Sequence, residues 1–478
     1  MKKEFLGNDF LLENDTAERL YFEYSEQLPI IDYHCHIDAK DIYEDRRFND
    51  ICELWLGGYD GSGRLAGDHY KWRLMRANGI EEKYITGDGD PVQKFIRFVK
   101  TLSKAIGNPM YHWCALELKN YFGITDRLDI PNTAKIMNRC NDLLKNDPAL
   151  SARGIIMKSN VEFIGTTDDP TDDLKWHKKI AEDKGITFKV CPSFRPDKAL
   201  AVRDKGFRDH MDRLAGCTGK ESLETAGDVL EALKTRLDDF VSCGCKAADH
   251  GLLYVPYNSI PMEECDRIYK KAMSKGEITD AEADGYTTRM LLELAKEYSR
   301  RGIVMEIHYS CARNVNKGRY ETLGPDSGFD MIAASPGCND LAKFMSELDE
   351  TDELPKTVIF SLDPSDNARI DTLAGCFPGT DVAGKVQHGA AWWFNDSKAG
   401  IEEHLKSLAA YGILGNFIGM LTDSRSLLSY ARHEYFRRIA CNMIGSLVES
   451  GEYPDSEHDL KMIVEGISYY NAKRYFGI

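Results

Sequence analysis

Short apolar, β-branched runs recur along this chain of 478 residues, and each one ends in polar or titratable side chains. Helical patterns separate these runs, for example over residues 170–184, 287–301, 340–348 and 398–411. Alternation of strands with helices is typical of a parallel sheet, because each parallel neighbour needs a crossover connection. Eight strands are predicted, at residues 29–36, 160–169, 186–195, 245–250, 302–308, 357–363, 385–393 and 416–423.

Eight strand–helix units favour a closed barrel, with an open doubly wound sheet as the alternative. No glycine-rich phosphate-binding motif follows a predicted strand, which argues against a nucleotide-binding open sheet. The segment between the first two strands is far longer than one crossover helix requires, and it contains helical runs at 92–106 and 134–144. We therefore predict an α/β fold, a distorted (β/α)8 TIM barrel with helical insertions after its first and fourth strands.

The predicted organisation follows from these connections. Residues 1–39 hold the N-terminal segment and the first strand, residues 40–159 form a helical insertion or cap, and residues 160–478 complete the barrel. The second insertion lies at about 251–286, at the barrel rim where lids are commonly found.

Composition limits the partners of the chain. Its net charge of −16 argues against nucleic acid and against an anionic membrane, because long-range attraction would need the opposite sign. The thirteen cysteines include no Cys-x-x-Cys pair, the N-terminus has no apolar signal core, and no run approaches the roughly 18 apolar residues of a membrane span. We expect a cytoplasmic protein with reduced thiols that acts on a small molecule.

Two histidines stand one residue apart in the first predicted strand. In an extended chain the side chains of His34 and His36 point to the same face, whereas Cys35 points away. A His-x-His pair alone is more often an ordinary surface feature. Here, however, titratable and aromatic residues end most of the other strands, and in a barrel these ends meet at one face. The strand-end residues are His34, His36, Arg195, Asp249, His308, Asp363, Trp392 and Asp423.

His34, His36 and Asp423 would supply two imidazoles and one carboxylate, a donor set that suits zinc, iron or manganese. They would meet because the first and eighth strands are neighbours in a closed barrel. A helix cap is the alternative role for Asp423. His308 is a candidate metal ligand, a candidate substrate contact or a satisfied core histidine.

Arginine side chains offer a way for an acidic protein to bind an anion. Arg195 and Arg425 are candidates for bidentate contacts with a carboxylate, with surface ion pairs as the alternative. Trp392 would more often be a core residue, but beside a polar site its ring can form an apolar wall.

Together these motifs resemble the uronate isomerases, also called glucuronate isomerases, of the amidohydrolase superfamily. The resemblance covers nearly the whole chain. The matching segments are Ile31–His36, Glu44–Phe48, Gly67–Arg73, Met75–Gly79, Asn108–Trp113, Thr166–Pro170, Phe194–Asp197, Trp392–Asp396 and Met420–Ser426. One departure is His388, which stands where the family usually has an apolar or aromatic residue.

The resemblance implies an enzyme that interconverts D-glucuronate with D-fructuronate and D-galacturonate with D-tagaturonate, and we also expect a homo-oligomer. It implies one divalent metal ion on His34, His36 and Asp423, for which zinc is expected first, with iron or manganese as alternatives. It also implies a substrate pocket lined by Tyr70, Arg195, Asp249, His308, Trp392 and Arg425. Lys246 should lie deeper than Asp249 and on the opposite strand face, which favours a single metal over the two-metal sites of related hydrolases.

An aldose–ketose isomerisation moves a proton from C2 to C1 through a cis-enediol. We expect Asp423, Tyr70 and His308 to be the catalytic side chains, with Asp423 taking the C2 proton and Tyr70 acting as shuttle or donor. Hydride transfer is the alternative route. Two other functions remain open to the sequence: a metal-dependent hydrolase or decarboxylase of the same superfamily, and a sugar-acid binder without activity.

Overall fold

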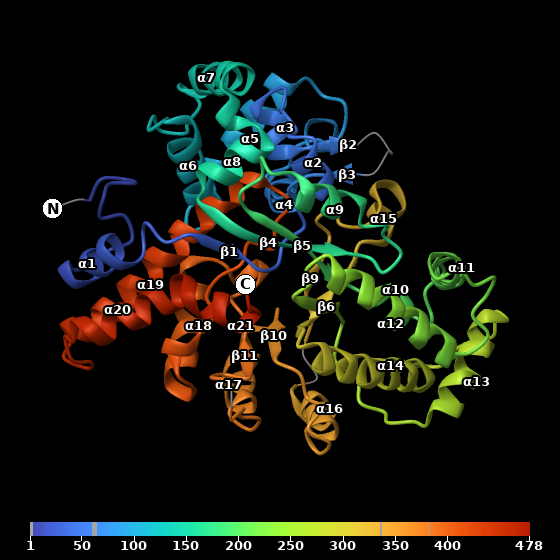
Figure 1. Cartoon of the computed structure of the whole chain (residues 1–478). Helices are drawn as coiled ribbons and strands as arrows, with labels where there is room; N and C mark the ends of the chain where they lie inside the picture. Colours follow the sequence, from blue (N-terminus) through green and yellow to red (C-terminus); the bar gives the residue numbers. More distant parts are fainter. Residues whose placement is uncertain (1–2, 60–64, 335–336, 381) are drawn as a thin grey trace.

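A seven-stranded parallel sheet forms the centre of the computed structural model, which describes residues 3–59, 65–334, 337–380 and 382–478 (Figure 1). Its strands lie side by side in chain order. They are β1 (Ile30–Asp32), β4 (Val161–Asp168), β5 (Lys189–Phe194), β6 (Ala247–Gly251), β7 (Val304–Tyr309), β10 (Thr357–Ser361) and β11 (Val386–His388). These seven predicted strands are confirmed, although β1 ends four residues earlier than predicted.

The predicted eighth strand at residues 416–423 is wrong as a regular strand. A short 3-10 helix, Leu414–Asn416, is followed by an irregular segment that lies beside the end of β1. The backbone N–H of Asp423 donates to the carbonyl of His34 at 3.2 Å, and that of His36 donates to the carbonyl of Ser424 at 3.0 Å. Gly419 and Asp423 have φ angles of 78° and 44°, which interrupt the pleat that a strand requires. The sheet is therefore an incomplete barrel, consistent with a distorted TIM barrel.

Asp32 joins β1 to this irregular segment. Its carboxylate, which is fully buried, accepts hydrogen bonds from the backbone N–H of Thr422 at 2.8 Å and from the Thr422 hydroxyl at 2.7 Å. The Tyr33 hydroxyl adds a bond to the carbonyl of Gly419 at 3.0 Å. These contacts hold the last strand-like segment against the first strand.

Helices fill the connection from β1 to β4 and gather at the top of Figure 1. A small hairpin of β2 (Gly58–Tyr59) and β3 (Leu65–Ala66) lies among them. The predicted helical runs at 92–106 and 134–144 correspond to α5 and α7, and the division of the chain into domains stays a prediction. The helices are α2 (Ala39–Tyr43), α3 (Ile51–Leu56), α4 (His69–Ala77), α5 (Pro91–Leu102), α6 (Pro109–Phe122), α7 (Thr133–Asn146) and α8 (Ala152–Lys158).

The remaining connections are also helical. Helix α14 begins seven residues before its predicted start, because Thr279 and Glu282 form a capping box at its N-terminus. Two short strands after β7, β8 (Cys311–Ala312) and β9 (Met331–Ile332), pair in antiparallel orientation across a connection that contains a helix. The helices are α9 (Lys175–Glu182), α10 (Asp197–Leu200), α11 (Phe207–Cys217), α12 (Ala226–Ser242), α13 (Met262–Met273), α14 (Asp280–Arg301), α15 (Lys317–Leu323), α16 (Asn339–Asp349), α17 (Asn367–Ala374) and α18 (Lys398–Tyr411).

The two ends of the chain pack together, as Figure 1 shows for the blue and red helices. Helix α1 (Asp15–Tyr24) contacts α19 (Ala431–Glu449), where the Thr16 hydroxyl donates to Glu449 at 2.6 Å. Helices α20 (Glu457–Glu465) and α21 (Asn471–Phe476) complete the C-terminus. No helix in the described part of the chain is both long and apolar enough to cross a membrane, and all thirteen cysteines are free.

His388, the departure from the family pattern, is accommodated by a buried partner. Its Nδ1 lies 2.7 Å from Oδ1 of Asp371, and its ring packs against that of His404 at 4.3 Å between centroids. The polar ring at the end of β11 therefore has a carboxylate to satisfy it, as a buried imidazole requires.

We expect Asp32→Ala to destabilise the metal-free protein by about 2–4 kcal/mol, because the buried N–H and hydroxyl of Thr422 would both lose their acceptor. Urea unfolding after dialysis against a chelator measures this, since the metal then cannot contribute. Thr422→Val is the matched control and should cost only about 1 kcal/mol, since the backbone bond remains. Equal losses for the two variants would contradict the role of Asp32.

Candidate active site

A cavity of about 520 Å³ opens at the carboxyl ends of the parallel strands. Of the predicted strand-end and pocket residues, Asp249 and Asp363 do not line it, and Asp249 lies fully buried in β6 next to Arg195 and His308. The lining includes His34, His36, Tyr70, Arg195, His308, Trp392, Asp423 and Arg425. Asp363 is not among the lining residues and instead caps a 3-10 helix at Pro364–Asp366.

His34, His36 and Asp423 converge as candidate metal ligands. Oδ1 of Asp423 lies 2.9 Å from Nε2 of His36 and 3.3 Å from Nε2 of His34. Ligands bound about 2.0–2.2 Å from one cation lie about 3 Å from each other, so this donor set fits a divalent ion. The left-handed backbone at Asp423 turns its carboxylate toward the two rings from the segment beside β1.

Buried negative charge surrounds His34. Its Nδ1 lies 3.1 Å from Oε2 of Glu306, and both side chains are buried. Burial would lower the pKa of His34, but Asp249, Asp423 and Glu306 raise this pKa well above its ordinary value. Burial likewise opposes ionisation of Asp423, yet the bonds to His34 and His36 hold its pKa well below the usual range. A bound cation would neutralise this excess of negative charge.

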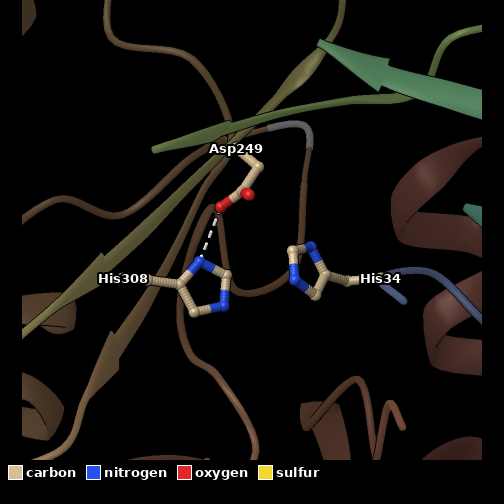
Figure 2. Close-up of side chains that lie close together, drawn as sticks. All are labelled: His34, Asp249 and His308. Carbon is tan, nitrogen blue, oxygen red and sulfur yellow. Dashed lines mark hydrogen bonds and ion pairs between the residues drawn. The ribbon is translucent and has the colours of Figure 1, made fainter. Parts of the chain in front are cut away.

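A second cluster joins His34 to Asp249 and His308 (Figure 2). Nδ1 of His308 lies 2.7 Å from Oδ1 of Asp249, while the ring stacks on Phe360 at 4.2 Å between centroids. The buried Nε2 of His308 has no hydrogen-bond partner among the described residues. With Nδ1–H donating to the carboxylate, Nε2 is an acceptor that can contact either a cation or a substrate.

Trp392 does more than form an apolar wall. Its indole N–H donates to Oδ2 of Asp423 at 2.6 Å, and its ring meets that of His308 at 4.7 Å between centroids. The two oxygens of Asp423 therefore have different partners, with histidines on one and the indole on the other. This arrangement fixes the orientation of the carboxylate.

Cationic side chains provide the local basic surface that an acidic protein needs to hold an anion. Arg195 donates from Nε to Asp197 at 2.8 Å and lies 3.0 Å from Asp249; burial opposes its charge, but these carboxylates raise its pKa. Arg425 donates to Asp326 at 2.8 Å. Lys246 is not among the residues that line the cavity, and its amine donates to the carbonyl of Gly477 at 2.8 Å.

Tyr70 reaches the cavity from helix α4, in the long connection between β1 and β4. Asp68 caps this helix by accepting from the backbone N–H groups of Tyr70 and Lys71. The Tyr70 hydroxyl donates to Asp396 at 3.3 Å. Burial and the charge of Asp396 raise the pKa of Tyr70 well above its ordinary value, so the hydroxyl keeps its proton at neutral pH.

Sequence reasoning missed several residues of this site. Glu306 could have been found, because it precedes His308 by two residues in a strand and so shares its face. Arg313 and Asp326 line the cavity from the segment after β7, and Asp396 lies beside it, but no local pattern indicated these contacts.

The parallel sheet of this protein brings two histidines, a carboxylate and arginines together at the carboxyl ends of its strands. This arrangement is typical of α/β enzymes that act on small molecules at that edge of the sheet. The sequence profile of glucuronate isomerase matches residues 1–476. The chain belongs to this family.

Known uronate isomerases match this chain over nearly its whole length and theirs. Uronate isomerases from Lachnoclostridium phytofermentans and Lachnospira eligens are each 48% identical to this chain over 475 residues. Each match covers 99% of this chain, together with 100% of the first relative and 99% of the second. The crystal structure of uronate isomerase from Thermotoga maritima is 34% identical, with a TM-score of 0.91, and the match covers 99% of this chain and 100% of that one.

Glu306→Gln should weaken binding of a divalent cation about 10- to 100-fold, because the amide orients His34 less strongly than a carboxylate does. Competition against a chromophoric chelator measures this affinity without any activity assay. Asp371→Asn is the matched control, since Asp371 forms a similar buried pair with His388 away from the cavity. Unchanged affinity in Glu306→Gln would contradict the orienting role.

Proposed function

We propose that this chain interconverts D-glucuronate with D-fructuronate and D-galacturonate with D-tagaturonate. The observation that carries this proposal is the convergence of His34, His36 and Asp423 beside arginines in one cavity. The names of the full-length relatives support the same activity.

Substrate binding depends on the cationic side of the cavity. Arg195 and Arg425 hold the carboxylate and hydroxyls of the sugar acid by charge-assisted hydrogen bonds. Asp249 fixes one of these arginines and also orients His308, and Trp392 supplies the apolar wall. Nε2 of His308, for which the described part of the chain offers no partner, accepts a hydrogen bond from a sugar hydroxyl.

His34, His36 and Asp423 would hold one divalent ion, with zinc expected first and iron or manganese as alternatives. When bound, the ion would supply Lewis acidity to the sugar acid. His308 lies close enough to His34 to serve as a further ligand in place of its substrate contact, since ligand atoms of His34, Asp249 and His308 lie within 4.8 Å of one another.

Proton transfer is assigned to Asp423 and Tyr70. Asp423 remains ionised at neutral pH, so it can take the proton from C2 and return it to C1. Tyr70 retains its proton and donates it to the oxygen on C1 as the cis-enediol forms, and it regains a proton from the hydroxyl on C2 when C2 becomes the carbonyl of the ketose. Charge would otherwise accumulate on an oxygen away from water.

The assay that tests this function incubates the purified protein with each uronate, before and after chelation and readdition of zinc, iron or manganese. We expect ketose formation that disappears with the metal and returns with at least one ion. Inactivity with every ion would overturn the proposal. Bond cleavage instead of ketose formation would indicate a hydrolase or decarboxylase, and binding without turnover would indicate a sugar-acid binder.

Turnover in deuterium oxide separates the two routes. Proton transfer through Asp423 predicts deuterium at C1 of the ketose, because the carboxyl proton exchanges with solvent before its return. Mass spectrometry of the product measures the label. A product without deuterium at C1 would favour hydride transfer from C2 and would remove Asp423 from its role as base.

We place this activity in the cytoplasm and in a homo-oligomer. Both statements are predictions of the sequence and its resemblance to the family. The net charge of −16 is consistent with a small-molecule substrate and with no nucleic-acid or membrane partner.

A further inference from the structure

Tyr70 is held at both ends by carboxylates. Its backbone N–H donates to Asp68 at 2.9 Å, and its hydroxyl donates to Asp396 at 3.3 Å. Asp68 belongs to the same segment as Tyr70, whereas Asp396 lies after β11. The position of the hydroxyl therefore depends on a residue from a distant part of the chain.

Arg432 lies between these two carboxylates. Its guanidinium nitrogens are 3.8 Å from Asp396 and 3.9 Å from Asp68, and its carbon lies 5.3 Å from the centroid of the Tyr70 ring. The same guanidinium stacks on Trp113 at 4.0 Å. Arg432 is buried in α19, so one fixed cation contacts the ring of Tyr70 and both of its carboxylate partners.

The charge of Arg432 also affects the protonation state of Asp396, and therefore how strongly Asp396 accepts the hydrogen bond from Tyr70. Burial raises the pKa of Asp396 to about 7, while Arg432 and the bond from Tyr70 oppose this rise. Without the arginine, the buried carboxyl would become neutral at higher pH values than it does now. A neutral carboxyl accepts a hydrogen bond from a hydroxyl less strongly than a carboxylate does.

We propose that Asp396 and Arg432 are positioning residues that hold the Tyr70 hydroxyl in the orientation needed for proton transfer. Neither residue need touch the substrate: Asp396 fixes the hydroxyl, and Arg432 fixes Asp396, the ring and the helix cap. The inference rests on the proposed role of Tyr70 in the isomerisation.

A double-mutant cycle on the metal-loaded enzyme tests this role with Tyr70→Phe, Asp396→Asn and their combination. Asp396→Asn should lower kcat by up to about 100-fold with little change in KM, as expected when a reacting group is misplaced. In the Tyr70→Phe background the same substitution should cause no further loss, because the hydroxyl it positions is gone. Additive losses, or full kcat in Asp396→Asn, would overturn the proposal.

Asp366→Asn is the matched control. Asp366 is buried, accepts from the Tyr309 hydroxyl at 3.0 Å and pairs with Arg369 at 2.8 Å, so it forms a tyrosine–aspartate–arginine set outside the cavity lining. The kcat of the Asp366→Asn variant should match that of the parent enzyme. A loss equal to that of Asp396→Asn would attribute both effects to general destabilisation and overturn the positioning role.

Arg432 gives an independent measurement if Asp396→Asn folds poorly. Arg432→Lys keeps the charge and should retain more kcat than Arg432→Met, with thermal unfolding used to confirm that both variants are folded. Equal kcat in the two variants would overturn the charge-dependent role. Full turnover by Tyr70→Phe would instead refute the proposed part of Tyr70 in catalysis, and an inactive parent enzyme would refute the proposed function itself.

Discussion

The contact between β1 and residues 417–424 is the constraint on which the site depends. Seven strands form a ladder in chain order, but His34 and His36 meet Asp423 only because the irregular segment covers the open side of the sheet beside β1. Asp32 holds that segment through Thr422, one residue before the candidate ligand. Because closing such a long loop has an entropic cost, these buried bonds must fix a contact that local structure cannot supply.

Paired charges explain how an acidic chain presents cations to an anion. Arg195 is oriented by Asp197 and Asp249, and Arg425 by Asp326, so the arginines are held in place before any ligand arrives. Such preorganisation reduces the entropy lost on binding. The same carboxylate of Asp249 orients His308, which couples the anion-binding side of the cavity to the candidate metal side.

The sequence predicted the parts of this structure that have local signals. Apolar β-branched runs marked seven strands, and their polar ends marked the site, because strand ends of a parallel sheet meet at one edge. The prediction of an eighth strand was wrong because left-handed φ angles at Gly419 and Asp423 interrupt a run of residues whose apolar pattern is continuous in the sequence. The pairing of Tyr70 with Asp396 and Arg432 had no local signal, since three separate segments meet only in the folded chain.

The side chains around the cavity are therefore held in place in two ways, by backbone hydrogen bonds and by buried charged groups. The parallel strands β6 and β7 fix Asp249 and His308 through the backbone ladder. His34 and His36 follow the end of β1 and are fixed by backbone bonds to the segment at Asp423 and Ser424. Tyr70 comes from a helix outside the sheet and is fixed by buried charge. A buried ion pair contributes little net stability, because desolvation offsets its attraction, but removing one partner is costly. Asp68 illustrates this balance: burial would raise its pKa, yet Lys71 and Arg432 lower it to about 2. Arg432 of α19 contacts both Asp68, the N-cap of α4, and the ring of Tyr70, so this buried charge links the two helices directly.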